Sequence, residues 1–194
     1  QNYINKEYKT KENNNKANFS YPKKKIRIAY YSPDFRRHAV SHLIANVFEN
    51  HNKDDFEILG FHFSKYRDDD MTKRISAAFD KFFDVKNISD QDVISKSRDL
   101  KIDIAIDLAG YTADNRANIL INRVAPIQIN FLGHPGSLGS HMDYIIADKN
   151  IINDVLQVAY TLITSSKCLI FLLQLLANKE PPLKAALVFD FKCF

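Results

Sequence analysis

DIAIDL, at residues 103–108, is a short and largely apolar run that ends just before a turn residue, Gly110. Two other runs have the same form: IRIAYY at residues 26–31, and IQINFL at residues 127–132, which stops at Gly133. Apolar runs of this length are typical of strands that are buried on both faces, as in a parallel sheet covered by helices. They predict an α/β fold.

Helical periodicity fills the segments between these strands. Residues 41–48 place Leu43, Ile44, Val47 and Phe48 at helical spacing. We expect further helices at residues 71–79, from Ser89 onward and at residues 115–121, and further strands at residues 56–63, 82–85 and 144–147, the last of the domain. Strands that alternate with helices predict a Rossmann-like, doubly wound, mostly parallel sheet.

The first strand is followed by a loop rich in polar side chains, SPDFRRHAVSH at residues 32–42. Ligands of such sheets sit beyond the carboxyl ends of the strands, so this loop is a candidate site. Arg36 and Arg37 could donate to an anionic ligand, and His38 could exchange a proton near neutral pH. The alternative is an ordinary surface loop in which Ser41 caps the next helix and one histidine makes only structural contacts.

Two further strand ends carry candidate groups. After Leu108, the segment 109–112 brings the hydroxyls of Tyr111 and Thr112 to the rim of the sheet. The loop 133–144 has three glycines and exposed backbone N–H groups, which suit phosphate or hydroxyl-rich ligands. An ordinary turn and a flexible glycine loop remain the alternatives. The residues alone therefore predict an α/β domain with a polar cleft.

Composition bounds the class of protein. The net charge is +4, and much of the excess comes from lysines in the first 25 residues. We interpret residues 1–24 as a polar, flexible linker and expect no nucleic-acid binding, because no aromatic platform accompanies the charge. Cys168 and Cys193 form no CxxC and no metal spacing, which favours a reducing, cytoplasmic location.

The apolar run CLIFLLQLL at residues 168–176 is about half of what spans a bilayer, and Lys167 and Lys179 close it. We expect no membrane helix; a buried helix or a non-native reading frame is the better interpretation. The chain begins with Gln1 and shows no signal-peptide pattern, so we expect a fragment of a longer polypeptide.

The same three loops carry motifs that resemble a known family. YYSPDFRRHAVSHL, at residues 30–43, is similar to the opening segment of the O-linked N-acetylglucosamine transferase/SPINDLY glycosyltransferases. DLAGYTADNRANILINRVAPIQINFLGHPGSLGSHMDYIIAD, at residues 107–148, is similar to their second signature, which includes a Gly-Tyr-Thr turn and a His-Pro-Gly loop. The motifs match in order and spacing from about residue 25 to residue 153.

The resemblance implies the first lobe of a GT-B glycosyltransferase, an inverting enzyme with two Rossmann-like lobes. It implies transfer of N-acetylglucosamine from UDP-N-acetylglucosamine to Ser or Thr hydroxyls of a protein acceptor. Relatives use GDP-fucose or glucosylate asparagine from UDP-glucose, so those donors stay open. Residues 25–153 would be the N-terminal catalytic lobe, and the linker 1–24 could follow tetratricopeptide repeats.

The resemblance also implies roles for single residues. It implies that His38 is a base or a substrate-positioning group. It implies that a larger set lines the cleft near sugar and acceptor: Tyr111, Thr112, His134, Pro135 and Gly136. The nucleotide would be held by a C-terminal catalytic lobe that is missing here. No cofactor and no metal are expected, since the aspartates at residues 68–70 are assigned to a helix start.

This sequence departs from the family pattern at several single positions, which include Ala29 and Tyr30 in place of a usual Gly-Tyr, and in its tail. Leu138 and Val124 stand where the family often has serine and proline. Residues 154–194 lose the pattern altogether, so we interpret them as a frameshifted or divergent tail. Because the donor-binding lobe is missing, we expect the chain alone to be inactive. The competing hypothesis is a non-catalytic binding module that kept only the acceptor side.

Overall fold

The computed structural model describes residues 25–131, 133, 139–147 and 167–170. Its elements follow one another in the order β1 (Ile26–Ser32), α2 (Ala39–Glu49), β2 (Phe56–His62), α3 (Asp70–Ala78), β3 (Lys81–Asp84), α4 (Asp90–Asp99), β4 (Ile104–Asp107), α5 (Ala117–Ile121), β5 (Ile127–Phe131), the 3-10 turn η1 (Gly139–His141), β6 (Tyr144–Ala147) and β7 (Lys167–Ile170). The predicted linker 1–24 and most of the predicted tail 154–194 lie outside the described residues.

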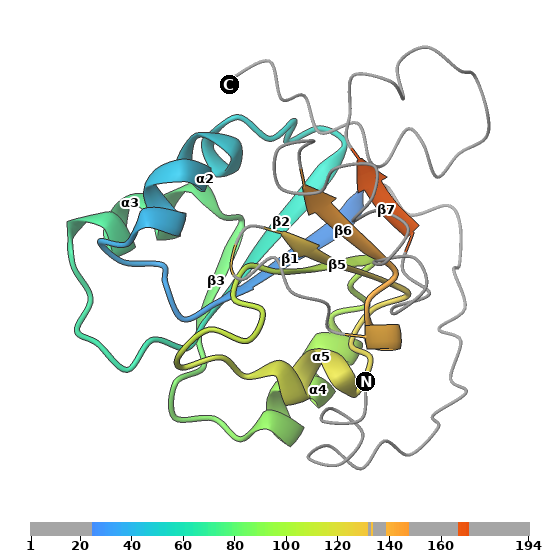
Figure 1. The fold of residues 1–194 in the computed structure, drawn as a ribbon. Coiled ribbons are helices and arrows are strands. Elements are labelled where there is room, and N and C mark those ends of the chain that lie inside the picture. Colours follow the sequence, from blue (N-terminus) through green and yellow to red (C-terminus); the bar gives the residue numbers. More distant parts are fainter. Residues whose placement is uncertain (1–24, 132, 134–138, 148–166, 171–194) are drawn as a thin grey trace.

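The strands form one sheet in the order β3-β2-β1-β4-β5-β6-β7, and every neighbouring pair is parallel (Figure 1). The chain builds outward from β1 in one direction, then returns to place β4 on its other side. The strand order therefore reverses between β1 and β4. The predicted Rossmann-like, doubly wound α/β fold is confirmed.

Helices cover both faces of this sheet (Figure 1). Apolar side chains of α2 and α3 pack on one face, on a core that includes Ile28, Tyr30, Ile44, Phe48, Ile58 and Ile75. Side chains of α4 and α5 pack on the other face, on a core that includes Tyr31, Phe61, Val93, Ile94, Ala105 and Ile119. Because successive residues of a strand point to opposite faces, continuous apolar runs fill both cores.

Side chains cap the helices at two of the predicted helix starts. The Asp69 side chain accepts from the N–H of Thr72 and the Thr72 hydroxyl accepts from the N–H of Asp69, which closes a capping box at α3. The Ser89 side chain accepts from the N–H of Asp92 and caps α4. The acidic residues 68–70 therefore serve a helix start, as expected.

The strand β7 corrects two expectations. Residues 144–147 are not the last strand, since residues 167–170 pair with β6 in parallel register. The beginning of the apolar run 168–176 is thus a strand and not a buried helix. Without β7, β6 would be an edge strand with unpaired backbone groups, and pairing with β7 satisfies them. No helix among the described residues is long and apolar enough to cross a membrane.

Candidate active site at the carboxyl edge of the sheet

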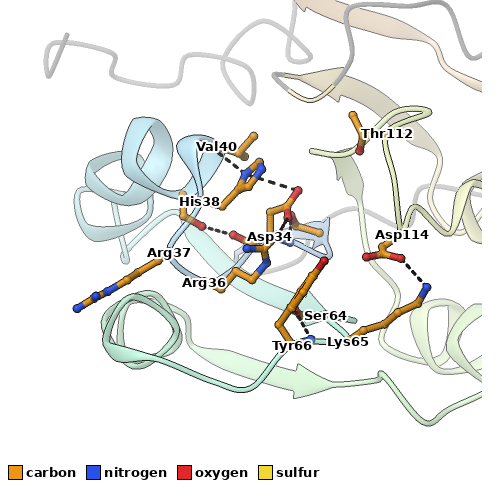
Figure 2. Close-up of polar contacts among 12 residues, drawn as sticks. Asp34, Arg36, Arg37, His38, Val40, Ser64, Lys65, Tyr66, Thr112 and Asp114 are labelled. Atoms are coloured by element: carbon orange, nitrogen blue, oxygen red, sulfur yellow. Dashed lines mark hydrogen bonds and ion pairs between the residues drawn. The ribbon is translucent and has the colours of Figure 1, made fainter.

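The loops after β1, β2 and β4 meet at one edge of the sheet (Figure 2). The three strands are neighbours and run parallel, so their carboxyl ends lie together. The reversal of strand order falls between β1 and β4, and such switch points are where open α/β sheets bind ligands. The loops that carry His38 and Thr112 therefore flank the position that the topology favours.

The loop after β1 is anchored from within. Phe35 is fully buried, and its ring packs against Phe48 and Phe79 at centroid distances of 5.8 and 5.5 Å. The Ser32 hydroxyl accepts from the N–H of Asp34 at 2.9 Å. The Ser41 hydroxyl donates to the Asp34 carbonyl. Ser41 therefore braces the loop and does not cap the helix, which corrects that alternative.

His38 is the residue that caps α2. Its Nδ1 accepts from the N–H of Val40 at 3.3 Å, and its side chain is 37% exposed. A ring nitrogen that accepts carries no proton, so the neutral ring in this geometry holds its proton on Nε2. His38 thus presents an N–H donor at the edge. It could act as a base through Nε2 only if the proton moved to Nδ1.

The two arginines of the loop have different partners. Arg36 donates from Nη2 to Oδ1 of Asp34 at 3.1 Å, and its guanidinium lies over the ring of Tyr66 at 4.3 Å. Arg37 points away from this group and binds Asp70 through Nε and Nη2 at 2.6 and 2.8 Å (Figure 2). Arg36 therefore belongs to the candidate site, and Arg37 secures the start of α3.

The loop after β2 also borders the candidate site, which the sequence did not predict. Tyr66 is 56% exposed, and its N–H donates to the Ser64 hydroxyl at 3.1 Å. Lys65 forms an ion pair with Asp114, which joins this loop to the loop after β4 (Figure 2). The carboxyl-end rule applies equally to the predicted strand 56–63, and would have pointed to residues 64–66.

The loop after β4 is held by a buried carboxylate. Asp107 accepts from the N–H groups of Ala109 and Gly110, both at 3.0 Å. Burial raises the pKa of Asp107 to about 6, while these two hydrogen bonds lower it in part. Gly110 has a φ of 60°, a conformation that glycine adopts without strain. This turn fixes the path of the chain toward Thr112.

The predicted substrate-binding residues of this turn are engaged within the fold. The Thr112 hydroxyl donates to the Ala109 carbonyl at 3.0 Å. Tyr111 is half-buried and packs against the core beneath α4 and α5. His134, Pro135 and Gly136 lie outside the described residues, so their predicted role and that of the turn remain predictions. Asp143 accepts from Arg123 and from the N–H of Gln128, so it ties the segment before β6 to β5.

Gly133 shows how the third loop begins. A Cβ atom at this position would lie 2.5 Å from both the carbonyl carbon and the oxygen of Ala109. The chain after β5 therefore passes against the backbone of the turn after β4. Among the described residues, no group of three or more His, Cys, Asp or Glu side chains could hold a metal ion.

Comparison with known proteins agrees with this geometry. The family model for glycosyl transferase family 41 matches residues 4–167. The Arabidopsis thaliana "Probable UDP-N-acetylglucosamine–peptide N-acetylglucosaminyltransferase SEC" is 35% identical over 65% of this chain and 13% of its own length. The Arabidopsis protein of the same description named SPINDLY is 31% identical over 68% of this chain and 15% of its own length.

A mutant O-GlcNAc transferase from Thermobaculum terrenum has a similar solved structure, with a TM-score of 0.69 and 25% sequence identity. The match covers 75% of this chain and 27% of the bacterial one. This chain thus spans a small part of the proteins it matches. The family match over residues 4–167, together with the fold, shows that the chain belongs to glycosyl transferase family 41, the family of the O-GlcNAc transferase and SPINDLY proteins.

Proposed function

We propose that this chain supplies the acceptor-side lobe of an inverting protein O-glycosyltransferase, with UDP-N-acetylglucosamine as the donor and Ser or Thr hydroxyls as acceptors. The observation that carries the proposal is the grouping of His38, Asp34 and Arg36 at the switch point of the sheet. The names of the relatives supply the donor and the peptide acceptor. The donor-binding lobe would lie beyond residues 25–153, which we propose as one lobe.

The proposed reaction makes one demand on this edge. The acceptor oxygen forms a bond to the anomeric carbon as the bond from that carbon to the diphosphate breaks, and UDP leaves with the electron pair. The hydroxyl proton must pass to a base during the attack. His38 is a half-exposed ring that stands beside a carboxylate, so it is suited to accept or to orient that proton.

The family match extends beyond both ends of the proposed lobe, to residues 4 and 167. The strand β7 also adds part of the region 154–194 to the sheet. We keep the division into a linker at residues 1–24, a lobe at 25–153 and a tail at 154–194 as a proposal about folding units. A stable, cooperatively unfolding fragment 25–153 would support the division, and an unfolded fragment would contradict it.

The function can be tested in a fusion of this chain to the part of the Arabidopsis SEC protein that follows the matched region. Transfer to a serine-containing peptide is measured with UDP-N-acetylglucosamine, GDP-fucose and UDP-glucose in parallel. We expect transfer from the first donor alone, and none by the unfused chain. Transfer by the unfused chain would contradict the two-lobe proposal, and transfer only from another donor would reassign the sugar.

Two histidines of the same segment give a matched pair for the role of His38. His38→Ala should lower turnover about 10²–10⁴-fold, because proton transfer by a positioned side chain contributes that much. His42 is exposed on α2, so His42→Ala should keep the rate of the unaltered fusion. A near-normal rate for His38→Ala would remove it from the reaction.

A further inference from the structure

We propose that Arg36 is a positioning residue that acts on His38 through Asp34. By holding Asp34, it keeps the neutral ring of His38 in the form that carries its proton on Nε2. Release of Asp34 lets this carboxylate accept a hydrogen bond from Nδ1–H, so the ring proton moves from Nε2 to Nδ1 and Nε2 becomes free to accept another proton. The effect of this contact on catalysis rests on the proposed function, whereas its effect on the tautomer of His38 does not.

Asp34 stands between two partners and satisfies one of them. Its Oδ1 lies 3.1 Å from Nη2 of Arg36, which is hydrogen-bond distance. Its Oδ2 lies 3.7 Å from Nδ1 of His38, which is beyond it. The carboxylate is 11% exposed, so water competes little for either oxygen. A shift of less than about 1 Å toward His38 would create the second hydrogen bond.

The Nδ1 atom of His38 can serve only one neighbour at a time. When it carries no proton, it accepts from the N–H of Val40, the contact that the structure has at 3.3 Å. When it carries the proton, it donates to Asp34 and loses the capping bond to Val40. The neutral ring holds a single proton, so the two contacts exclude each other and correspond to opposite tautomers.

Arg36 is held where it can restrain Asp34 and still release it. Its guanidinium lies over the ring of Tyr66 at 4.3 Å, which orients it from the loop after β2. It reaches Asp34 by one nitrogen only, and a single contact is weaker than the two-pronged pair that arginine often makes with carboxylates. Its Nε is buried without a hydrogen-bond partner in the described part of the chain.

This arrangement decides what His38 can do at the edge. While Arg36 holds Asp34, Nε2 of His38 carries a proton. It can then donate to an acceptor oxygen and orient it, but it cannot accept the proton of that oxygen. In the released state, Nε2 takes the hydroxyl proton, and Asp34 stabilises the resulting imidazolium through Nδ1–H. One proton is transferred and no other reactant is required.

The test is a nitrogen-15 spectrum of the His38 ring in the whole chain, recorded at about pH 8, where free imidazole is neutral. Long-range proton–nitrogen correlations distinguish the two tautomers. We expect the Nε2–H form in the unaltered chain, and a shift of about tenfold or more toward Nδ1–H in Arg36→Gln, because a charge-assisted hydrogen bond favours that form. The same tautomer in both would overturn the proposal.

Two further variants isolate the route through Asp34. Arg37→Gln removes the neighbouring charge, but that charge pairs with Asp70, so the His38 signal should stay unchanged. In the double variant Arg36→Gln/Asp34→Asn, the Nε2–H form should return, since the carboxylate is gone. An unchanged Nδ1–H form in the double variant, or a shift in Arg37→Gln, would contradict the mechanism.

Tyr66→Leu provides a second test of the proposal if the Arg36→Gln variant does not fold. Tyr66 is largely exposed, and its loss removes the ring that orients the guanidinium without touching Asp34. We expect a smaller shift in the same direction, and no shift would contradict the role of the stack. A tautomer change without sugar transfer in the fusion would count against the proposed function alone.

Discussion

The loops after β1 and β4 flank the same switch point, yet they are built in opposite ways. The loop after β4 is held by contacts to its own backbone, through the Asp107 carboxylate and the close approach of Gly133. The loop after β1 is held by Phe35 below, while the buried Asp34 contacts the more exposed Arg36 and His38 through side chains. One wall of the candidate site is rigid, and the other is adjustable.

The difference has a physical reason. Backbone groups have fixed positions and bind the buried carboxylate in one geometry. Side chains such as Arg36 and His38 can exchange one partner for another by rotating about their side-chain bonds, without moving the backbone. The proposed reaction needs both properties, because the acceptor must be placed reproducibly while its proton is transferred. Substitutions in the rigid wall should therefore cost stability, and those in the adjustable wall should change function instead.

The largest effect should come from Gly133→Ala. The added Cβ would meet the Ala109 backbone at 2.5 Å, and a backbone cannot move aside as a flexible side chain can. We expect a loss of about 3 kcal/mol in the free energy of unfolding by urea denaturation. Gly110→Ala adds a methyl group where φ is 60° and should cost about 1 kcal/mol. Equal stability of Gly133→Ala and the unaltered chain would refute the close approach.

A smaller effect should appear in the pH dependence of Asp107. Burial raises the pKa of Asp107 from 3.8 to about 6, so the folded chain holds this proton more tightly than the unfolded chain. The resulting stability is fully present below about pH 4 and is lost as the pH rises through about 6. Relative to Asp107→Asn, the unaltered chain should gain about 2 kcal/mol between pH 6.5 and pH 4.5.

Comparing the two chains at each pH removes the contributions of other groups. Burial lowers the pKa of His51 to about 4, so its protonation destabilises both chains alike as the pH falls from about 6.5 to 4. Urea unfolding curves across that range give the difference directly. A difference that stays constant with pH would show that Asp107 ionises normally, and that the rigid wall is not built on a buried carboxyl.

The smallest effect should come from the ion pair that joins the loops after β2 and β4. Lys65 is 75% exposed, so Lys65→Ala should leave the free energy of unfolding unchanged within measurement. Asp114 has a φ of 62°, and Asp114→Gly should offset the lost ion pair by relieving the backbone. A clear loss of stability in Lys65→Ala would show that the contact between the loops after β2 and β4 is as rigid as the contacts within the loop after β4.

The sequence predicts most of the framework. The predicted strands in the runs 26–31, 103–108 and 127–132 correspond to β1, β4 and β5 of one parallel sheet, because strands of such a sheet are apolar on both faces. Ser89 and the acidic residues before α3 mark helix starts, since capping is a local interaction. The strand β7 was not predicted, because its pairing depends on an edge that lies some twenty residues away in sequence.

For the candidate site, the sequence identifies the residue types and the loops, and His38 stands where the strand-end rule puts it. It does not show that His38 caps its own helix, that Arg37 turns to Asp70, or that Tyr66 and Lys65 come from a third loop. Those facts depend on contacts between segments far apart in the chain. Hydrophobic period and capping act within a few residues, whereas charged partners are chosen only after the strands have been brought side by side.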